Sequence, residues 1–313
     1  MHLLFNTNNF KRMEKIKSSR IIDLAKNEVK GFTEMFNLLE QKVLLGGLSN
    51  STLLNYGRCI AKISLHFKCP AMLLDEEQIN GYLQHLLRGS QPSKSYFKHT
   101  VYGLRFLFRI HDLEDRIIKL PSLKRSNKLP VVLNHQECKL LFKSCRILKH
   151  TTLFCLIYSA GLRAMEVRNL KISDIDFERM TIHIRQTKYN KDRYVPLSSL
   201  MLKGLLKYIE AYNPKVFLFN GKTVGSQFSQ RGVQWAMKQS MKRSGILKPA
   251  TVHTLRHSYA THLLEYGMDI DTLRKLLGHA HLNTTLIYLH VARLDGSKKF
   301  SPFDKLYGLD ENG

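Results

Sequence analysis

The sequence predicts a mainly helical protein with one small β-sheet, an α+β fold that divides into two domains. Apolar residues recur three and four positions apart over most of the chain, which is the spacing of amphipathic helices. Only residues 181–185 and 193–197 have the composition of paired strands. The length of 313 residues exceeds the roughly 100–200 residues of one domain. Composition changes at residues 119–130, where we expect the two domains to join.

Both halves of the chain are strongly basic. The formal net charge is +24, with 21 basic and 11 acidic residues up to position 130 and 28 and 14 after it. Two basic domains favour a long polyanion as the partner, and nucleic acid is the leading candidate. The hydrophobic content of 43% excludes a disordered chain.

Cellular context follows from the cysteines and from the hydropathy pattern. The five cysteines are odd in number and contain no C-x-x-C pair, so we expect free thiols in a reducing compartment. No stretch of about 18 apolar residues is present, so we expect neither a membrane span nor a membrane partner. The prediction is a cytoplasmic, nucleoid-associated protein.

The first domain is predicted to be a helical bundle over residues 31–118, after a basic polar lead-in at residues 1–30. Ser49 or Ser51 can cap one helix, and the acidic residues from Asp75 can begin the next. A further helix is expected after Pro92. The three helices carry apolar stripes at Leu53, Tyr56, Ile60, Ile63 and Phe67, at Ile79, Leu83 and Leu86, and at Tyr96, Val101, Leu104, Leu107 and Phe108.

Residues 119–130 are predicted to be an extended linker. This segment contains two prolines, four cations and no acidic residue. Proline disfavours helix and extends the residue before it. The linker is either a solvated connector or a segment that lies along DNA phosphates through Lys124, Arg125 and Lys128.

The second domain is predicted over residues 131–295, with a tail at 296–313. Asn134 can cap its first helix. The two strands form a basic hairpin whose turn begins at Lys188. Gly245, Gly267 and Gly278 are each placed to end a helix.

The residues able to do chemistry are concentrated late in the chain. Thr251 can cap a helix that places His253 and Arg256 three residues apart, on neighbouring faces. His279 follows Gly278, and Tyr288 comes nine residues later, on a short helix that begins near Asn283. Guanidiniums neutralise phosphate oxygens, an imidazole transfers protons and a phenol can attack phosphorus. Other tyrosines, Tyr158, Tyr259 and Tyr266, fall in stripes expected to be buried.

A second arginine is available near Gly161, which ends a helix. Arg163 opens the next helix, and Glu166 three residues on can orient a neighbouring group. In the hairpin turn, Lys188 or Lys191 could protonate a leaving 5′-oxygen. A metal site is disfavoured, because Thr254 stands where zinc hydrolases with histidines spaced like His253 and His257 place a glutamate.

The order of these motifs resembles that of the tyrosine recombinases of the phage integrase and Xer group. Along the chain the motifs are G-L-R-x-x-E, a hairpin lysine, H-x-x-R, L-G-H and a downstream tyrosine. The likeness extends from about residue 32 to 295. It implies an N-terminal core-binding (SAM-like) domain and a C-terminal catalytic domain that form a C-shaped clamp on DNA. By position, Arg163 and Arg256 resemble the phosphate-binding arginines and Lys188 the general acid. His253 and His279 resemble the assisting histidines, Tyr288 the nucleophile and Glu166 a supporting acid.

The resemblance also implies an activity and an assembly. Strand exchange would proceed through a 3′-phosphotyrosine and a Holliday junction, without metal or ATP cofactors. The active unit would be a tetramer, of one chain or with a paralogue, aided by DNA-bending proteins. The tail at 296–313 would dock on a neighbouring protomer, or else simply pack or fray. A non-catalytic DNA-binding protein of the same fold is the alternative function.

Overall fold

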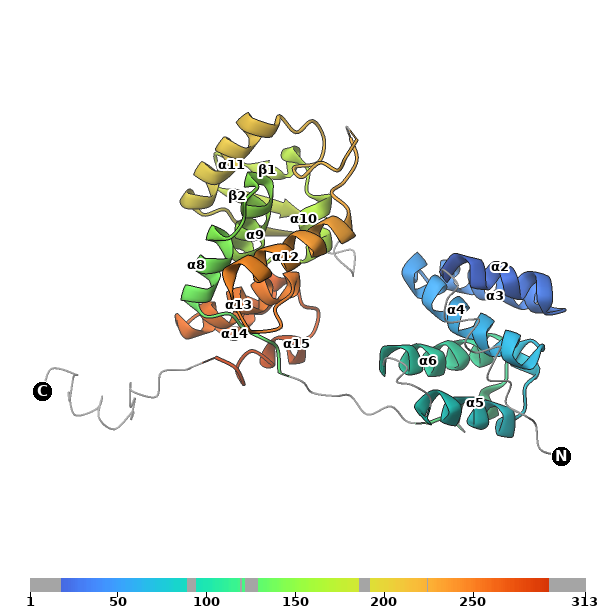
Figure 1. Ribbon diagram of the computed structural model, residues 1–313. Coiled ribbons are helices and arrows are strands. Elements are labelled where there is room, and N and C mark those ends of the chain that lie inside the picture. Colours follow the sequence, from blue (N-terminus) through green and yellow to red (C-terminus); the bar gives the residue numbers. More distant parts are fainter. Residues whose placement is uncertain are drawn as a thin grey trace, which may run out of the picture. The chain divides into compact units, whose positions relative to one another are not determined.

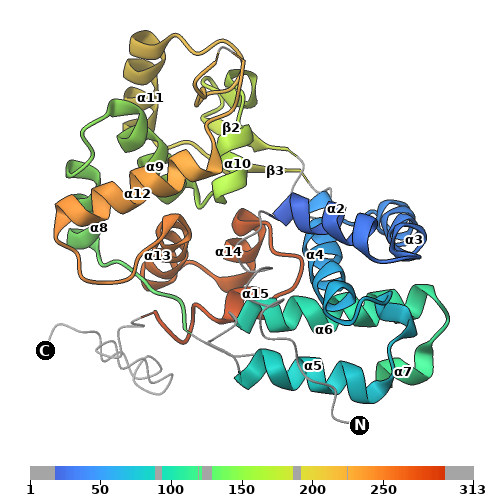
Figure 2. The same ribbon diagram turned by 45° about the vertical axis from the view of Figure 1, so that its right-hand side comes forward.

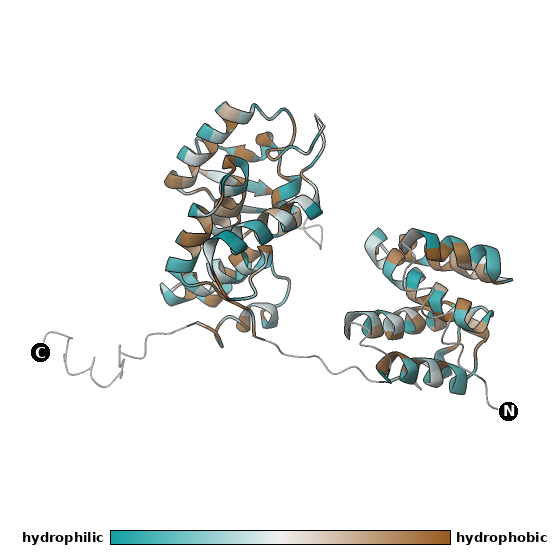
Figure 3. Cartoon of the chain, viewed as in Figure 1, coloured by the Kyte–Doolittle hydropathy of each residue, from teal (hydrophilic) through white to brown (hydrophobic). Residues whose placement is uncertain are grey.

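The computed structural model describes residues 18–88, 94–118, 120–121, 129–185, 192–223 and 225–292. The chain forms two compact units, Met1–Ser126 and Asn127–Gly313, and the boundary between them falls within the segment 119–130. No helix in the described ranges is long and apolar enough to cross a membrane. Helices of both units carry both hydrophobic and hydrophilic residues (Figure 3).

The N-terminal unit is built from helices alone in its described part (Figure 1). Helix α4 packs against α2, α3 and α6. Ser49 caps α4 by accepting the backbone N–H of Thr52, so the first of the two predicted caps is the one used. Phe32, Ile60 and Phe108 are fully buried in the core. The elements are α2 (Ser18–Glu28), α3 (Phe32–Leu45), α4 (Asn50–Phe67), the 3-10 turn η1 (Ala71–Leu73), α5 (Glu76–Arg88), α6 (Lys94–Ile110) and α7 (Glu114–Ile118).

The expected polar lead-in over residues 1–30 is wrong for residues 18–28, which form helix α2. Ile21, Ile22 and Ala25 make a short apolar stripe, and each is at most 6% exposed. Burial of such side chains against a neighbouring helix stabilises a short helix that its composition alone would not. Residues 1–17 lie outside the described part of the chain.

The C-terminal unit is mainly helical and carries a small sheet at one side (Figure 2). Asn134 caps α8 by accepting the backbone N–H of Glu137, as the sequence predicts. Its elements are α8 (His135–Lys143), α9 (Leu148–Ala160), α10 (Ala164–Asn169), η2 (Ile172–Asp174), β1 (Ile175–Asp176), β2 (Thr181–Ile184), β3 (Arg193–Pro196), α11 (Ser199–Tyr212), α12 (Gln230–Ser244), α13 (Val252–Glu265), α14 (Ile270–Leu277) and α15 (Asn283–Leu286).

The sheet has three antiparallel strands in the order β1-β2-β3. Its predicted hairpin is present, with Ile182 opposite Val195 and Ile184 opposite Arg193. Strand β1, of two residues, was not predicted. Strand β3 is an edge strand and therefore pairs on one side only.

Helix α13 is the central helix of this unit and packs against α9, α12 and α14. Ten of its 14 residues are buried, so it is covered on most sides. The expectation that Tyr266 belongs to its buried stripe is wrong: the side chain is 70% exposed. The reason is that the helix ends at Glu265, which turns Tyr266 outward to contact His135, with 2.7 Å between Oη and Nε2.

Candidate active site

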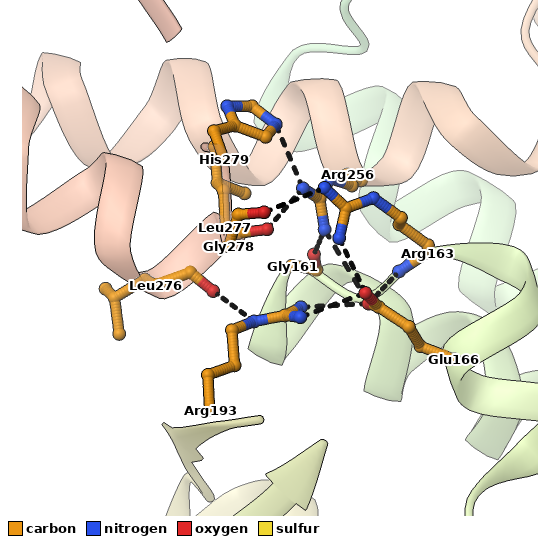
Figure 4. Close-up of polar contacts among 9 residues, drawn as sticks. All are labelled: Gly161, Arg163, Glu166, Arg193, Arg256, Leu276, Leu277, Gly278 and His279. Atoms are coloured by element: carbon orange, nitrogen blue, oxygen red, sulfur yellow. Dashed lines mark hydrogen bonds and ion pairs between the residues drawn. The ribbon is translucent and has the colours of Figure 1, made fainter. Parts of the chain in front are cut away.

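A single carboxylate lies at the centre of the site (Figure 4). Gly161 ends α9 with a φ of 62°, and this turn brings Arg163 and Glu166 to the start of α10. Arg163 donates to Glu166 twice, from its backbone N–H to Oε2 and from Nη1 to Oε1, both at 2.7 Å. Arg193 donates from Nη1 to Oε1 at 2.9 Å and from Nη2 to Oε2 at 2.8 Å. Nη1 of Arg256 lies 3.7 Å from Oε2.

Glu166 is ionised in this environment. Burial raises the pKa of its carboxyl, but the hydrogen bonds and charge of Arg193, together with the Arg163 N–H, outweigh burial and lower the pKa to about 2. The carboxylate therefore holds three guanidiniums close together, against their mutual repulsion.

Arg256 is the most deeply buried of the three arginines, with 3% of its side chain exposed. Nη1 donates to the carbonyl of Gly161 and Nη2 to that of Leu277, each at 2.6 Å. Burial, followed by the charge of Arg163, lowers the pKa of Arg256 to about 10, so it stays charged at neutral pH. Arg163 is 28% exposed and also donates to the carbonyl of Gly278 at 3.2 Å, so its guanidinium can meet a ligand.

His279 lies directly beside Arg256, as Figure 4 shows, with 3.0 Å between Nε2 and Nη2 of the arginine. Nδ1 lies 2.9 Å from the hydroxyl of Thr285. Burial, with the charges of Arg256 and Arg163, lowers the pKa of His279 to about 3. Because a guanidinium only donates, Nε2 of the neutral ring must accept, and Nδ1 carries the proton and donates to Thr285.

Tyr288 lies against His279 and is the last residue of the site along the chain. It lies just beyond α15, in the following turn, and not within the short helix where it was predicted. Its side chain is 2% exposed, and its ring stacks at 11° to that of His279 with 6.4 Å between centroids. Burial raises the pKa of the phenol, while the charges of Arg256 and Arg163 oppose this.

His257 is a site residue that the sequence reasoning missed. Its Nδ1 lies 3.0 Å from the phenolic oxygen of Tyr288. Burial, with the charges of His253 and Arg256, lowers the pKa of His257 to about 4, so the ring is neutral. In the sequence His257 directly follows Arg256, but it lies outside the H-x-x-R motif, and its spacing from His253 indicates only a possible metal ligand.

The sequence also does not single out Arg193, because an arginine at a strand end ordinarily points into solvent.

His253 is exposed on the first turn of α13, unlike the buried Arg256 and the partly buried His279. Partial desolvation of its ring by the surrounding protein, followed by the charges of Arg256 and Arg163, lowers the pKa of His253. It also lines a groove of about 480 Å³ among α10, α12 and α13.

The structure brings together most of the predicted catalytic set. Arg163, Glu166, Arg256, His279 and Tyr288 meet within one contact network, and His253 stands at its edge. The remaining predicted residues lie outside the described part of the chain: Lys188, Lys191, Lys124, Arg125 and Lys128. In the described ranges, no three His, Cys, Asp or Glu side chains are grouped so that they could hold a metal ion.

The arrangement suits chemistry at a phosphodiester. Two arginines from distant segments can neutralise the nonbridging oxygens as charge builds on them, and a neutral imidazole beside them can add a hydrogen bond. A phenol lies next to that imidazole and can act as a nucleophile.

Comparison with known proteins agrees with this chemistry. Residues 131–294 match the phage integrase family. The chain is 34% identical to a tyrosine recombinase of Thermosipho africanus, over 82% of this chain and 94% of that protein. It is 31% identical to tyrosine recombinase XerD of Staphylococcus epidermidis, over 82% of this chain and 93% of that protein.

Solved structures show the same fold. XerH recombinase bound to its difH substrate, in a pre-cleavage complex, matches with a TM-score of 0.62 and 25% identity over 94% of this chain and 89% of that one. A lambda integrase dimer bound to a COC′ core site matches with a TM-score of 0.66 and 18% identity over 86% and 78% of the two chains. Together with the sequence relatives, these matches mean that the chain belongs to the phage integrase family of tyrosine recombinases, which are DNA-recombining enzymes.

Proposed function

We propose that this chain is a site-specific recombinase that cuts and rejoins double-stranded DNA through a covalent 3′-phosphotyrosine. The observation that carries the proposal is the network in which Arg163 and Arg256 share the Glu166 carboxylate beside His279, with Tyr288 stacked on that histidine. Family membership supports the same reaction, as do the DNA complexes of structural relatives.

In the proposed step, the phenolic oxygen of Tyr288 bonds to phosphorus and the bond from phosphorus to the 5′-oxygen breaks. The phenol gives its proton to a neutral imidazole of the site, and the 5′-oxygen gains one from Lys188. The arginines carry the charge that develops on the nonbridging oxygens, and His253 and His279 add hydrogen bonds. The new ester preserves the energy of the broken bond, so a 5′-hydroxyl can reverse the step without ATP.

Covalent trapping tests this proposal. Wild-type protein is mixed with supercoiled plasmid carrying the DNA that flanks its gene, then quenched with detergent. We expect a protein–DNA adduct from wild type and from Tyr259→Phe, a matched control that loses a phenol from the same cluster. Tyr288→Phe should bind DNA as tightly and form no adduct. Adducts from Tyr288→Phe would show that another residue is the nucleophile. Tight DNA binding by wild type without any adduct would support the non-catalytic alternative.

The acid role of Lys188 has its own test. Lys188→Ala should slow cleavage of ordinary DNA strongly, since the 5′-oxygen then leaves unprotonated. A substrate with sulfur at the bridging 5′ position should restore the rate, because a thiolate needs no proton to leave. Restoration in Lys191→Ala instead would assign the role to Lys191.

DNA binding by a chain of net charge +24 should depend steeply on salt. Each phosphate contact releases counterions, and about six to ten contacts would lower affinity roughly 10³–10⁵-fold between 50 and 200 mM salt. Lys124, Arg125 and Lys128 are proposed to supply some of these contacts. A flat salt response would contradict this reading of the charge.

We further propose that the recombinase works as a tetramer on two sites, either alone or with a paralogue, through a Holliday junction. The segment 296–313 would dock on a neighbouring protomer, and DNA-bending proteins would assist. The biological role would be integration and excision of a mobile element or Xer-like resolution. Crosslinking of the protein on its site DNA should yield tetramers, and loss of those tetramers after removal of residues 296–313 would support the docking.

A further inference from the structure

Arg193 joins three segments of the C-terminal unit that are distant in sequence. It is the first residue of β3, five positions after Lys188, and only 8% of its side chain is exposed. Its Nη atoms bind both oxygens of Glu166, and Nε donates to the carbonyl of Leu276 at 2.8 Å. Figure 4 shows the guanidinium between α10 and the end of α14.

The guanidinium also packs closely against Gly278, the residue before His279. A Cβ placed on Gly278 would lie 3.0 Å from Cδ and from Nη1 of Arg193. Gly278 has a φ of 63°, which glycine adopts without strain. The turn that presents His279 is therefore shaped to fit this arginine.

Strand β3 lies at the edge of the sheet, has four residues and pairs only with β2, so its position depends on contacts outside the sheet as well. A two-point bond between a guanidinium and a carboxylate fixes direction as well as distance, which a single charge does not. The Glu166 carboxylate is itself held by the backbone and the side chain of Arg163.

We propose that Arg193 is a positioning residue that holds the hairpin bearing Lys188 in register with the phosphate-binding arginines and with His279. This inference rests on the proposed recombinase function. Loss of Arg193 would leave Lys188 intact but misplaced, and a displacement of about 1 Å can slow a reaction up to about 10²-fold.

Arg185 provides a matched control at the other strand of the same hairpin. It follows β2, is 54% exposed and binds Asp174 instead of Glu166. Replacing either arginine by methionine removes one charge at the hairpin base, but only Arg193→Met breaks the connection to the active site. Arg193→Lys keeps the charge but loses the two-point bond to Glu166. This variant replaces Arg193→Met in both measurements if Arg193→Met fails to fold.

The first measurement is amide hydrogen exchange of the protein without DNA. Arg193→Met should speed exchange at Val195, Leu197 and His279 by about tenfold or more, because local opening of the β2–β3 ladder and of the His279 turn becomes easier. Arg185→Met should leave His279 unchanged. Equal protection of these amides in Arg193→Met and wild type would overturn the proposal, whatever the protein does to DNA.

The second measurement compares cleavage of ordinary DNA with cleavage of the substrate that carries sulfur at the bridging 5′ position. Arg193→Met should cut ordinary DNA about 10- to 100-fold more slowly than wild type and regain most of that loss on the sulfur substrate. The ratio of the two rates cancels any change in DNA affinity, and Arg185→Met should keep the wild-type ratio. A loss that sulfur does not repair would show that Arg193 does not position the acid. Wild-type protein that cuts neither substrate would refute the proposed function, while the exchange measurement would still decide whether Arg193 holds the hairpin.

Discussion

Nδ1 of His257 lies 3.0 Å from the phenolic oxygen of Tyr288, and only 2% of that tyrosine is exposed. The proposed nucleophile is thus held in the interior by a neutral histidine. To reach a phosphate the phenol must turn outward and exchange this bond for contacts with DNA. The contact between the two residues therefore stabilises the fold and opposes the first movement of the reaction.

This bond should appear as a coupling between the two residues. His257→Phe and Tyr288→Phe should each lower the free energy of unfolding by about 1 kcal/mol, and the double variant should lose less than the sum by about 0.5–1.5 kcal/mol. Urea unfolding of the four proteins measures the cycle. Strictly additive losses would mean that the two groups do not share a hydrogen bond.

Glu166→Ala should be among the most damaging substitutions in the C-terminal unit. It leaves Arg193 and Arg256, which are 8% and 3% exposed, buried without their anion. Loss of one partner from a buried ion pair costs about 3–5 kcal/mol. Asp271→Ala is the control, since its pairs with Arg274 and Lys275 are exposed to solvent and should contribute little to stability. Thermal unfolding of both variants measures the difference, and equal losses would contradict a central role for Glu166.

Stability should fall with acid, and His257 and Glu166 should contribute in two different pH windows, while His279, with a pKa of about 3, contributes across both. The pKa of His257 is about 4, against about 6.5 unfolded, so the unfolded chain binds the proton first. Its contribution is therefore present above about pH 6.5 and is lost as pH falls toward 4. The pKa of Glu166 is about 2, against about 4.3 in the unfolded chain. The stability that Glu166 contributes is therefore lost as the pH falls from about 4.3 to about 2.

Variants can assign the two windows. The free energy of unfolding, measured from pH 7 to pH 3, should lose part of its slope above pH 4 in His257→Asn. Glu166→Gln should flatten the profile only below about pH 4.3. Profiles that keep the wild-type slope in both variants would assign the acid sensitivity to other groups.

Gly161→Ala should be much more destabilising than Gly245→Ala. Both glycines have positive φ, 62° and 69°, so each alanine pays the backbone cost of about 1–2 kcal/mol. At Gly161 the new Cβ would also lie 2.5 Å from the ring of Tyr259, whereas at Gly245 it meets nothing within 4 Å. Overpacking of this kind adds about 1–3 kcal/mol.

The same substitution should slow DNA cleavage, because the carbonyl of Gly161 accepts a hydrogen bond from Arg256 at 2.6 Å. Chemical unfolding of the two alanine variants, with rates on one DNA site, measures both effects. Similar stability for the two variants would show that the Tyr259 ring moves aside without cost.

Features that depend on residues close together in the chain can be predicted from the sequence. Helix starts at Ser49 and Asn134 and helix ends at Gly161, Gly245 and Gly278 follow from caps that act within one turn. The hairpin follows from strand composition around a turn. The ordered motifs identified Arg163, Glu166, Arg256, His279 and Tyr288, because their spacing resembles that of the family.

The contacts among these residues depend on how distant segments pack together. Arg193 reaches Glu166 across 27 positions, and Tyr288 reaches His257 across 31. No local spacing encodes such pairs, since they form only where strand, helices and turns pack together. The same packing buries α2, which its composition presents as polar. Local sequence motifs thus indicate which groups can react, and long-range packing sets the contacts and the pKa values of those groups.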